Sequence, residues 1–268
     1  MVHLLLAALL AQGADDRARD FVKRITFPDA DAIKAWTDQG KEHKQVLEVV
    51  LKREHWVAAA KEVESKLGPL KDEWSVEVKL GEWKGTHVAM GDRVGDKAQV
   101  RFNMRRLGEY ERRMDGFRKQ AEELQKQGKR MGWKVPPIKY ERIIHHELTH
   151  VLQGEYKSPG WFHEGLASWM GSDMNYVIAF GYAKKLVQSI EVDLSADPDD
   201  EYGRGMMFFR WIEDRSGAAA VKKLYEATAV AGGDWKKSLE EAVHLEWGKI
   251  VEAERAWSEK YCRRHTPD

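Results

Sequence analysis

The chain has 268 residues, of which 43% are hydrophobic and 33% are charged. This length suits one large domain, and the composition is too apolar for a disordered protein. Basic and acidic residues number 44 each, which argues against a nucleic-acid binder that relies on bulk positive charge. The single cysteine, Cys262, excludes an internal disulfide and a cysteine-based zinc finger.

No apolar run reaches the roughly 18 residues that a membrane-spanning helix needs, so we expect no membrane span. The longest run extends from Leu4 to Ala11, and small residues at Ala11 and Gly13 fit a signal-peptidase site. We therefore expect residues 1–13 to be a cleaved signal peptide, which would make the protein secreted or periplasmic. The alternative is a buried first helix or strand.

Hydrophobic spacing predicts an α+β fold. Apolar residues recur at steps of three and four between residues 30 and 67, which indicates an N-terminal helical segment at 14–68. Alternating or apolar runs then predict strands at 74–80, 87–90 and 99–104. An amphipathic helix is expected at 107–124, and helices separated by Gly and Asp/Pro breaks at 138–262. A small mixed sheet followed by a helical half is the expected architecture.

The sequence His146-Glu147-Leu148-Thr149-His150 is an H-E-x-x-H pattern within a helix expected at 139–154. His146 and His150 are one turn apart and point the same way, so both imidazoles can reach one zinc ion. An apolar stripe lies on the opposite side of this helix (Ile144, Leu148, Val151 and Leu152). Glu147 is rotated by about 100° from His146. It can reach a water molecule at the metal, as a general base does.

A third ligand is needed, and Glu164 follows His150 by fourteen residues, after a turn at Pro159-Gly160. Small residues at Gly165 and Ala167 would let the returning helix approach the first closely. The W-x-x-E-G-x-A pattern that begins at Trp161 resembles the gluzincin metallopeptidases of the thermolysin-like clan, in particular their peptidase MA-like members. The resemblance implies a zincin-like fold for residues 69–268. It also implies one zinc ion per chain, with Glu164 as the third ligand.

The segment that begins Tyr202-Gly203-Arg204-Gly205 is similar to the tyrosine-bearing helix of gluzincin aminopeptidases. The resemblance implies that the Tyr202 hydroxyl stabilises the oxyanion of the tetrahedral intermediate. A tyrosine that only starts a helix is the alternative, and Tyr176 and Tyr182 are rivals for the role.

Two departures from the family pattern stand out. Many gluzincins place an aspartate four residues after the third ligand, where this chain has Ser168; Asp173 is a substitute. The G-x-M-E-N motif of the family's aminopeptidases is absent, and Met90-Gly91-Asp92 does not replace it. Its absence argues against an amino-terminal exopeptidase and for an endopeptidase.

The sequence therefore predicts a zinc-dependent peptidase acting on peptides or proteins, with an oligomeric state that it leaves open. Strand 99–104 is either the edge strand that pairs with substrate or an ordinary strand. Three alternatives stay open for the whole chain: a catalytically inactive zincin-fold scaffold, a structural zinc site with His145 or His163 as fourth ligand, and a coincidental motif. His145 is otherwise expected on the helix surface, and Trp161 in the core.

Overall fold

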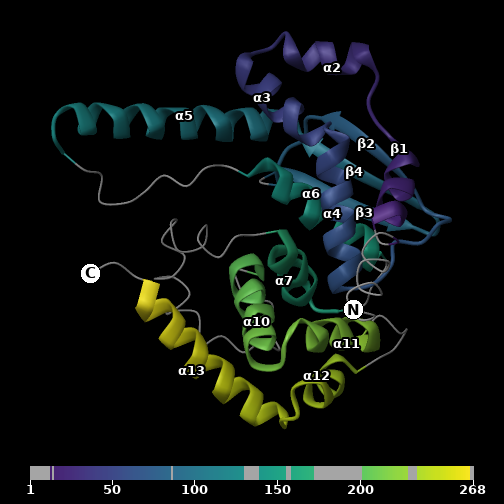
Figure 1. The fold of residues 1–268 in the computed structure, drawn as a ribbon. Coiled ribbons are helices and arrows are strands. Elements are labelled where there is room, and N and C mark those ends of the chain that lie inside the picture. The colour runs from purple at the N-terminus through teal and green to yellow at the C-terminus, as the bar shows by residue number, and fades with distance from the viewer. Residues whose placement is uncertain are drawn as a thin grey trace, which may run out of the picture. The chain divides into compact units, whose positions relative to one another are not determined.

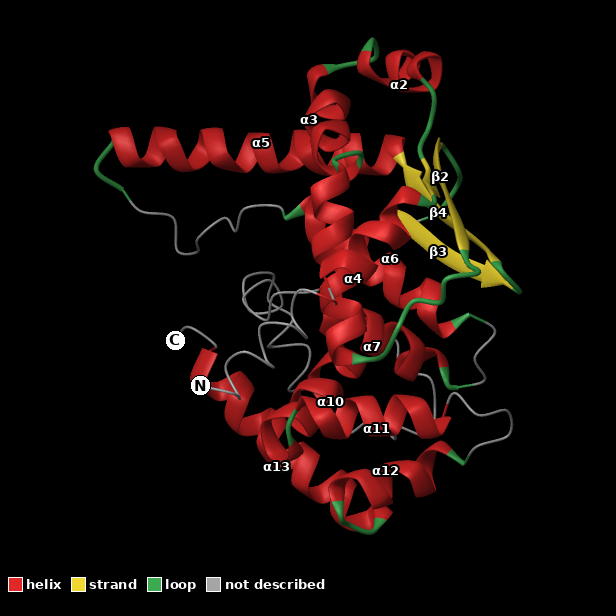
Figure 2. Cartoon of the chain, turned by 45° about the vertical axis from the view of Figure 1, so that its right-hand side comes forward, coloured by secondary structure: helices red, strands yellow, loops and turns green. Residues whose placement is uncertain are grey.

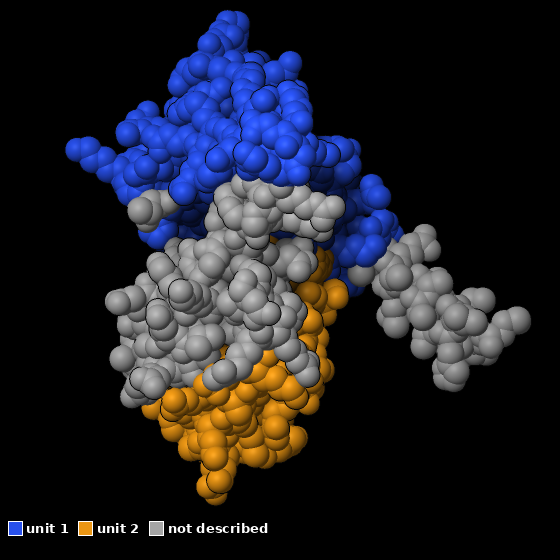
Figure 3. All heavy atoms as spheres, turned by 90° about the vertical axis from the view of Figure 1, so that its left-hand side faces the viewer, with its two compact units in different colours: residues 1–61, 70–151 blue, residues 62–69, 152–268 orange. Residues whose placement is uncertain are grey.

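The computed structural model describes residues 13, 15–85, 87–129, 139–154, 158–171, 201–228 and 234–265, with only the backbone at 201, 202, 204 and 262–265. The fold is mixed α+β, as expected. The chain forms two compact units, one of residues 1–61 and 70–151 and one of residues 62–69 and 152–268 (Figure 3). Helices α4 (Arg53–Lys66) and α6 (Tyr140–Gln153) each contribute residues to both.

The first unit begins with helices, which three breaks separate, and the first of these breaks contains strand β1 (Ile25–Thr26). Residues 15–23 are helical, followed by α2 (Ala30–Thr37), α3 (Lys41–Val50) and α4. The side chain of Asp29 caps α2 by accepting a hydrogen bond from the backbone N–H of Ala32 at 2.8 Å. Trp56 of α4 is fully buried and donates its indole N–H to the carbonyl oxygen of Val50 at 2.7 Å. This bond joins the end of α3 to α4.

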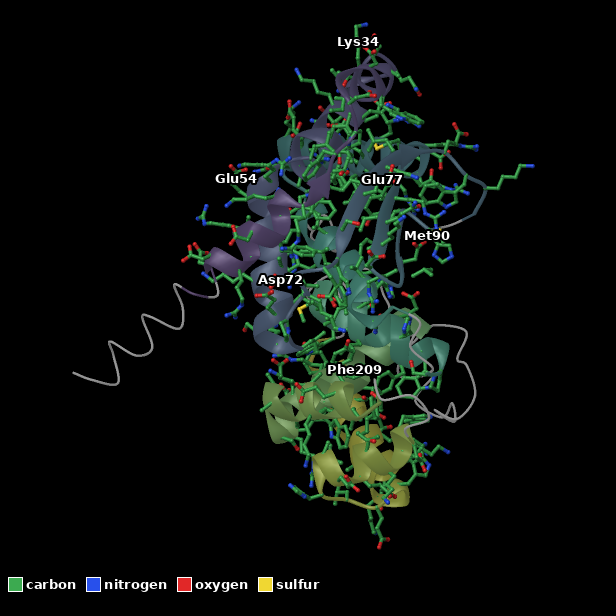
Figure 4. All side chains as sticks on the ribbon, turned by 90° about the vertical axis from the view of Figure 1, so that its right-hand side faces the viewer. Lys34, Glu54, Asp72, Glu77, Met90 and Phe209 are labelled. Carbon is green, nitrogen blue, oxygen red and sulfur yellow. The ribbon has the colours of Figure 1, made fainter. Side chains whose placement is uncertain are left out.

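A four-stranded sheet is the centre of this unit. Its strands are β1 (Ile25–Thr26), β2 (Ser75–Gly81), β3 (Ala89–Val94) and β4 (Lys97–Asn103), in the order β1-β2-β4-β3. β1 and β4 pair with β2 in parallel, and β3 pairs with β4 antiparallel. Trp74, Val76 and Val78 are buried while Ser75 and Glu77 are exposed, which confirms the predicted alternation. Figure 4 labels Glu77 on β2 and Met90 on β3.

Of the two alternatives for strand 99–104, the structure supports the ordinary strand, because β4 lies between β2 and β3. The edge strands of the described sheet are β1 and β3, and β3 begins two residues later than predicted. β1 was not predicted at all, since its two residues are too few to show a period.

Helix α5 (Met104–Lys126) follows β4 directly and confirms the predicted amphipathic helix. Asn103 caps it by accepting a hydrogen bond from the backbone N–H of Arg106 at 3.3 Å. All buried residues of α5 lie in its first half, between Met104 and Met114. The second half runs away from the sheet (Figure 2).

The second unit is helical in the part of the chain described. It contains α7 (Gly160–Gly171), α10 (Glu201–Ser216), α11 (Ala218–Thr228), α12 (Trp235–Val243) and α13 (Trp247–His265), with α7 and α10 side by side (Figure 1). Trp161 is fully buried, as expected, and its ring lies edge-on to Phe208 with centroids 5.2 Å apart. Phe162 and Phe209 extend this aromatic core at 4.9 Å. The core fixes α7 against α10.

None of the helices described has the length and apolar character needed to cross a bilayer. The expected signal peptide lies outside the described residues except for Gly13. The boundaries expected for the metallopeptidase-like domain stay a prediction.

Candidate metal centre

Helix α6 carries the H-E-x-x-H residues and has the two faces that the sequence predicts. Ile144, Leu148 and Val151 are fully buried and anchor the helix. His146 is half-buried, and His150 is 8% exposed. The imidazoles are therefore held on a rigid, packed helix.

The two imidazoles of α6 face each other. Their Nε2 atoms lie 3.1 Å apart, and the ring centroids lie 4.8 Å apart. Two nitrogen ligands of a tetrahedral zinc ion, each about 2.0–2.1 Å from the metal, are about 3.3 Å from each other. The observed separation matches this within a few tenths of an ångström. The separation of the two nitrogens is therefore compatible with one shared zinc ion.

The expected third ligand belongs to the same group. One ligand atom from each of His146, His150 and Glu164 lies within 4.8 Å of the others. Among the described residues, these three form the candidate metal-binding group, and neither His145 nor His163 is part of it. Two imidazoles and one carboxylate are a donor set that zinc binds well.

Glu147 is 3% exposed and lies where α6 meets the edge strand of the sheet. A Cβ added to Gly91 of β3 would be only 2.4 Å from the backbone oxygen of Glu147. Arg93, two residues further along β3, donates to the carbonyl oxygen of Val151 at 2.7 Å and lies over the ring of Trp74 at 4.0 Å. Two contacts therefore hold β3 against α6. At Gly91, the closer of the two, only glycine leaves enough space for the backbone of Glu147.

The start of α6 is anchored to α5. The hydroxyl of Tyr140 donates a hydrogen bond to the buried carboxylate of Glu111, which also accepts one from Arg118. Burial and this bond raise the pKa of the Tyr140 hydroxyl far above its usual range. Tyr140 is therefore a neutral donor at all physiological pH values.

Helix α7 presents Glu164 from a turn that is packed unusually close to α10. A Cβ on Gly165 would lie 2.5 Å from Cα of Gly205, and a Cβ on Gly205 would lie 2.1 Å from the backbone oxygen of Trp161. We expected Gly165 to let α7 approach the first motif helix, but its nearest neighbours are all in Gly205. The small residue serves the contact with α10 instead.

No family model, curated protein or solved structure matches the chain.

The remaining predicted residues have different outcomes. His145 was expected on the helix surface, but it is only 4% exposed, and its Nδ1 lies 2.9 Å from the carbonyl oxygen of Glu141. Ser168 is buried at 4% exposure in α7. Tyr202 is in the first turn of α10, but its side chain lies outside the described residues, as do Asp173, Tyr176 and Tyr182.

Sequence reasoning missed the role of three residues that shape the site: Gly91, Gln153 and Gly205. Gln153 could have been found, because it follows His150 by three residues and so shares its side of the helix. Gly91 and Gly205 make contacts with residues far away in sequence, which leave no local pattern.

Proposed function

We propose that the protein is a zinc-dependent peptidase with the gluzincin arrangement of residues, acting on internal peptide bonds. The observation that carries this proposal is the pair of facing Nε2 atoms of His146 and His150, grouped with the Glu164 carboxylate. These three residues would hold the zinc ion. When bound, the ion supplies Lewis acidity, which polarises the scissile carbonyl and makes the attacking water more acidic.

Glu147 would act as the general base. Its carboxylate takes a proton from the attacking water and passes it to the nitrogen of the leaving amine, so that the peptide C–N bond breaks and one water molecule is consumed. Glu147 lies in the same helix as the two imidazoles, one residue after His146, which supports this role. A site that only holds a structural metal has no use for it.

The outer edge of β3, which no other strand of the described sheet covers, would bind the substrate backbone. An extended peptide can add to a sheet edge through main-chain hydrogen bonds. β3 is an edge strand of the sheet, and Gly91 fixes it next to Glu147. Met90 and Val94 are 38% and 67% exposed on this strand. Such an edge accepts a segment inside a longer chain, which favours an endopeptidase.

Tyr202 would donate its hydroxyl to the developing oxyanion. The contact between Gly205 and Gly165 supports this role. Gly165 follows Glu164, and Gly205 lies three residues after Tyr202, so the first turn of α10 is beside the turn that carries the third ligand.

The alternatives are weaker on particular grounds. A structural zinc site requires a fourth protein ligand, and the described group contains three. Against a coincidental motif, the two Nε2 atoms lie 3.1 Å apart and are grouped with the carboxylate of Glu164 from another helix. An inactive zincin-fold scaffold differs from the enzyme only in lacking turnover, so an experiment must separate these two.

That experiment compares wild type with Glu147→Gln. We expect wild type to contain one zinc per chain and to cleave members of a diverse peptide library. Glu147→Gln should keep its zinc and lose at least about 100-fold in rate, which is the usual share of a general base. Glu141→Gln makes the same change six residues earlier in α6 and should have near-normal activity. Wild type that binds zinc and cleaves nothing would support the scaffold, and wild type without metal would refute the zinc site.

A further inference from the structure

Gln153 is the last residue of α6, and it connects this helix to α7. Its side-chain Nε2 donates to the carbonyl oxygen of His163 at 3.0 Å. Gln153 is only 5% exposed. Because it follows His150 by three residues, its side chain leaves the helix on the side that carries the metal-binding imidazoles.

The acceptor of this bond immediately precedes the third ligand. His163 lies in the first turn of α7, which the carbonyl oxygen of Pro159 closes by accepting from the N–H groups of Phe162 and His163, at 2.9 and 3.1 Å. A carbonyl oxygen has two lone pairs, so that of His163 can accept from Gln153 as well as from within the helix. The bond is not needed to form α7. It fixes where the first turn of α7 lies with respect to the last turn of α6.

Glu164 is thereby held on both sides. Gln153 fixes His163, the residue before it, and the close contact with Gly205 fixes Gly165, the residue after it. A long carboxylate side chain has several rotamers, and fixing it in one of them on metal binding costs conformational entropy. Fixing the backbone on both sides reduces the positions that the carboxylate can sample before metal binds.

We propose that Gln153 is a positioning residue that sets the Glu164 carboxylate for metal binding, so that part of the zinc affinity depends on its amide N–H. This inference rests on the proposed metal site. It assigns to Gln153 a role that acts through Glu164 and not through direct contact with the metal.

The chemistry of the bond defines the informative substitutions. Gln153→Met has almost the same length and shape as glutamine but no donor. Gln153→Glu keeps length and polarity, but an ionised carboxylate cannot donate to a carbonyl oxygen. Gln125→Met is the matched control, because Gln125 is exposed on α5.

The test is a double-mutant cycle on zinc affinity, measured by competition with a chromophoric chelator. Gln153→Met should weaken Zn²⁺ binding about 10–100-fold in the wild-type background, as the loss of groups that orient ligands commonly does. In the Glu164→Ala background the same change should have almost no effect, because the carboxylate to be positioned is gone. Gln125→Met should bind zinc like wild type. If Gln153→Met does not fold, as judged by circular dichroism without metal, Gln153→Glu should show the same loss.

The outcomes are distinct. An equal loss in both backgrounds would show that Gln153 only stabilises the fold, and an unchanged affinity in Gln153→Met would show that the bond is irrelevant; either overturns the inference. Both results leave the proposed function intact, since wild type binds zinc in each. Wild type that binds no zinc would overturn the proposed metal site itself and this inference with it.

Discussion

The contact between α7 and α10 makes Gly205→Ala a sharp test of how Glu164, the proposed third ligand, is held. The added Cβ would lie 2.1 Å from the backbone oxygen of Trp161, whereas real Cβ atoms essentially never approach closer than 3.0 Å. The helices must therefore separate by about 0.9 Å at this point. The obstacle is backbone, which cannot turn aside as a flexible side chain can. Zinc ligands tolerate errors of about 0.2 Å, so a shift of this size in the turn that carries Glu164 should disturb coordination.

We expect two measurable effects of Gly205→Ala. Overpacking should lower the free energy of unfolding of the metal-free protein by about 1–3 kcal/mol. This corresponds to a fall of roughly 2–12 °C in the midpoint of thermal unfolding. Zinc affinity should fall about 10–100-fold. Calorimetry and chelator competition measure these quantities.

The control for this prediction is Gly248→Ala in α13, where a Cβ would meet nothing within 4 Å. There the replacement of a glycine in the first turn of a helix should not destabilise the protein and should leave zinc affinity unchanged. If Gly205→Ala behaves like Gly248→Ala, the close approach of α7 and α10 does not determine the position of Glu164.

Three further predictions concern the rest of the fold. Gly91→Ala places a Cβ 2.4 Å from the Glu147 carbonyl oxygen. Urea denaturation should therefore show a free energy of unfolding that is lower by about 1–3 kcal/mol. The control, Gly116→Ala, at an open helical position, should not be destabilising. Tyr140 has a raised pKa in the folded state, because of burial and then its hydrogen bond to a carboxylate. Unfolded tyrosine ionises near pH 10, so the difference in unfolding free energy between wild type and Tyr140→Phe should be constant below about pH 10. Above that pH it should shrink by up to about 1.4 kcal/mol per pH unit. A difference that stays constant in urea titrations at alkaline pH would contradict this. Asp234 caps α12 by accepting from two backbone N–H groups, so Asp234→Ala should cost about 1 kcal/mol in thermal unfolding and Asp234→Asn clearly less; equal losses would argue against the cap.

The sequence predicted features that depend on local spacing. The amphipathic pattern of α6 follows from residues one helical turn apart, so its buried anchor and its pair of imidazoles could both be read from the period. The alternation from Trp74 to Leu80 likewise identified β2. These patterns are set by the geometry of one element, and the structure confirms them.

Features that depend on distant contacts could not be predicted in this way. β1 has two residues and is a strand only because β2 lies beside it. The helical period gives the direction of His145 relative to His146, but it does not say which elements cover that direction, and the histidine is buried. The sequence shows that a small residue stands at Gly165, but only the structure shows that this residue contacts α10.

Strand β1 has a consequence for how far the chain can be shortened. It covers the outer edge of β2, and the nearby Trp56 ring lies edge-on to both Phe27 and Phe102 at 5.7 and 6.4 Å. A fragment beginning at residue 69 would lose β1, Phe27 and Trp56 together. It would present a bare parallel strand next to an uncovered phenylalanine, a combination that promotes intermolecular strand pairing. Removing the first quarter of the chain should therefore yield insoluble material and not a smaller folded protein.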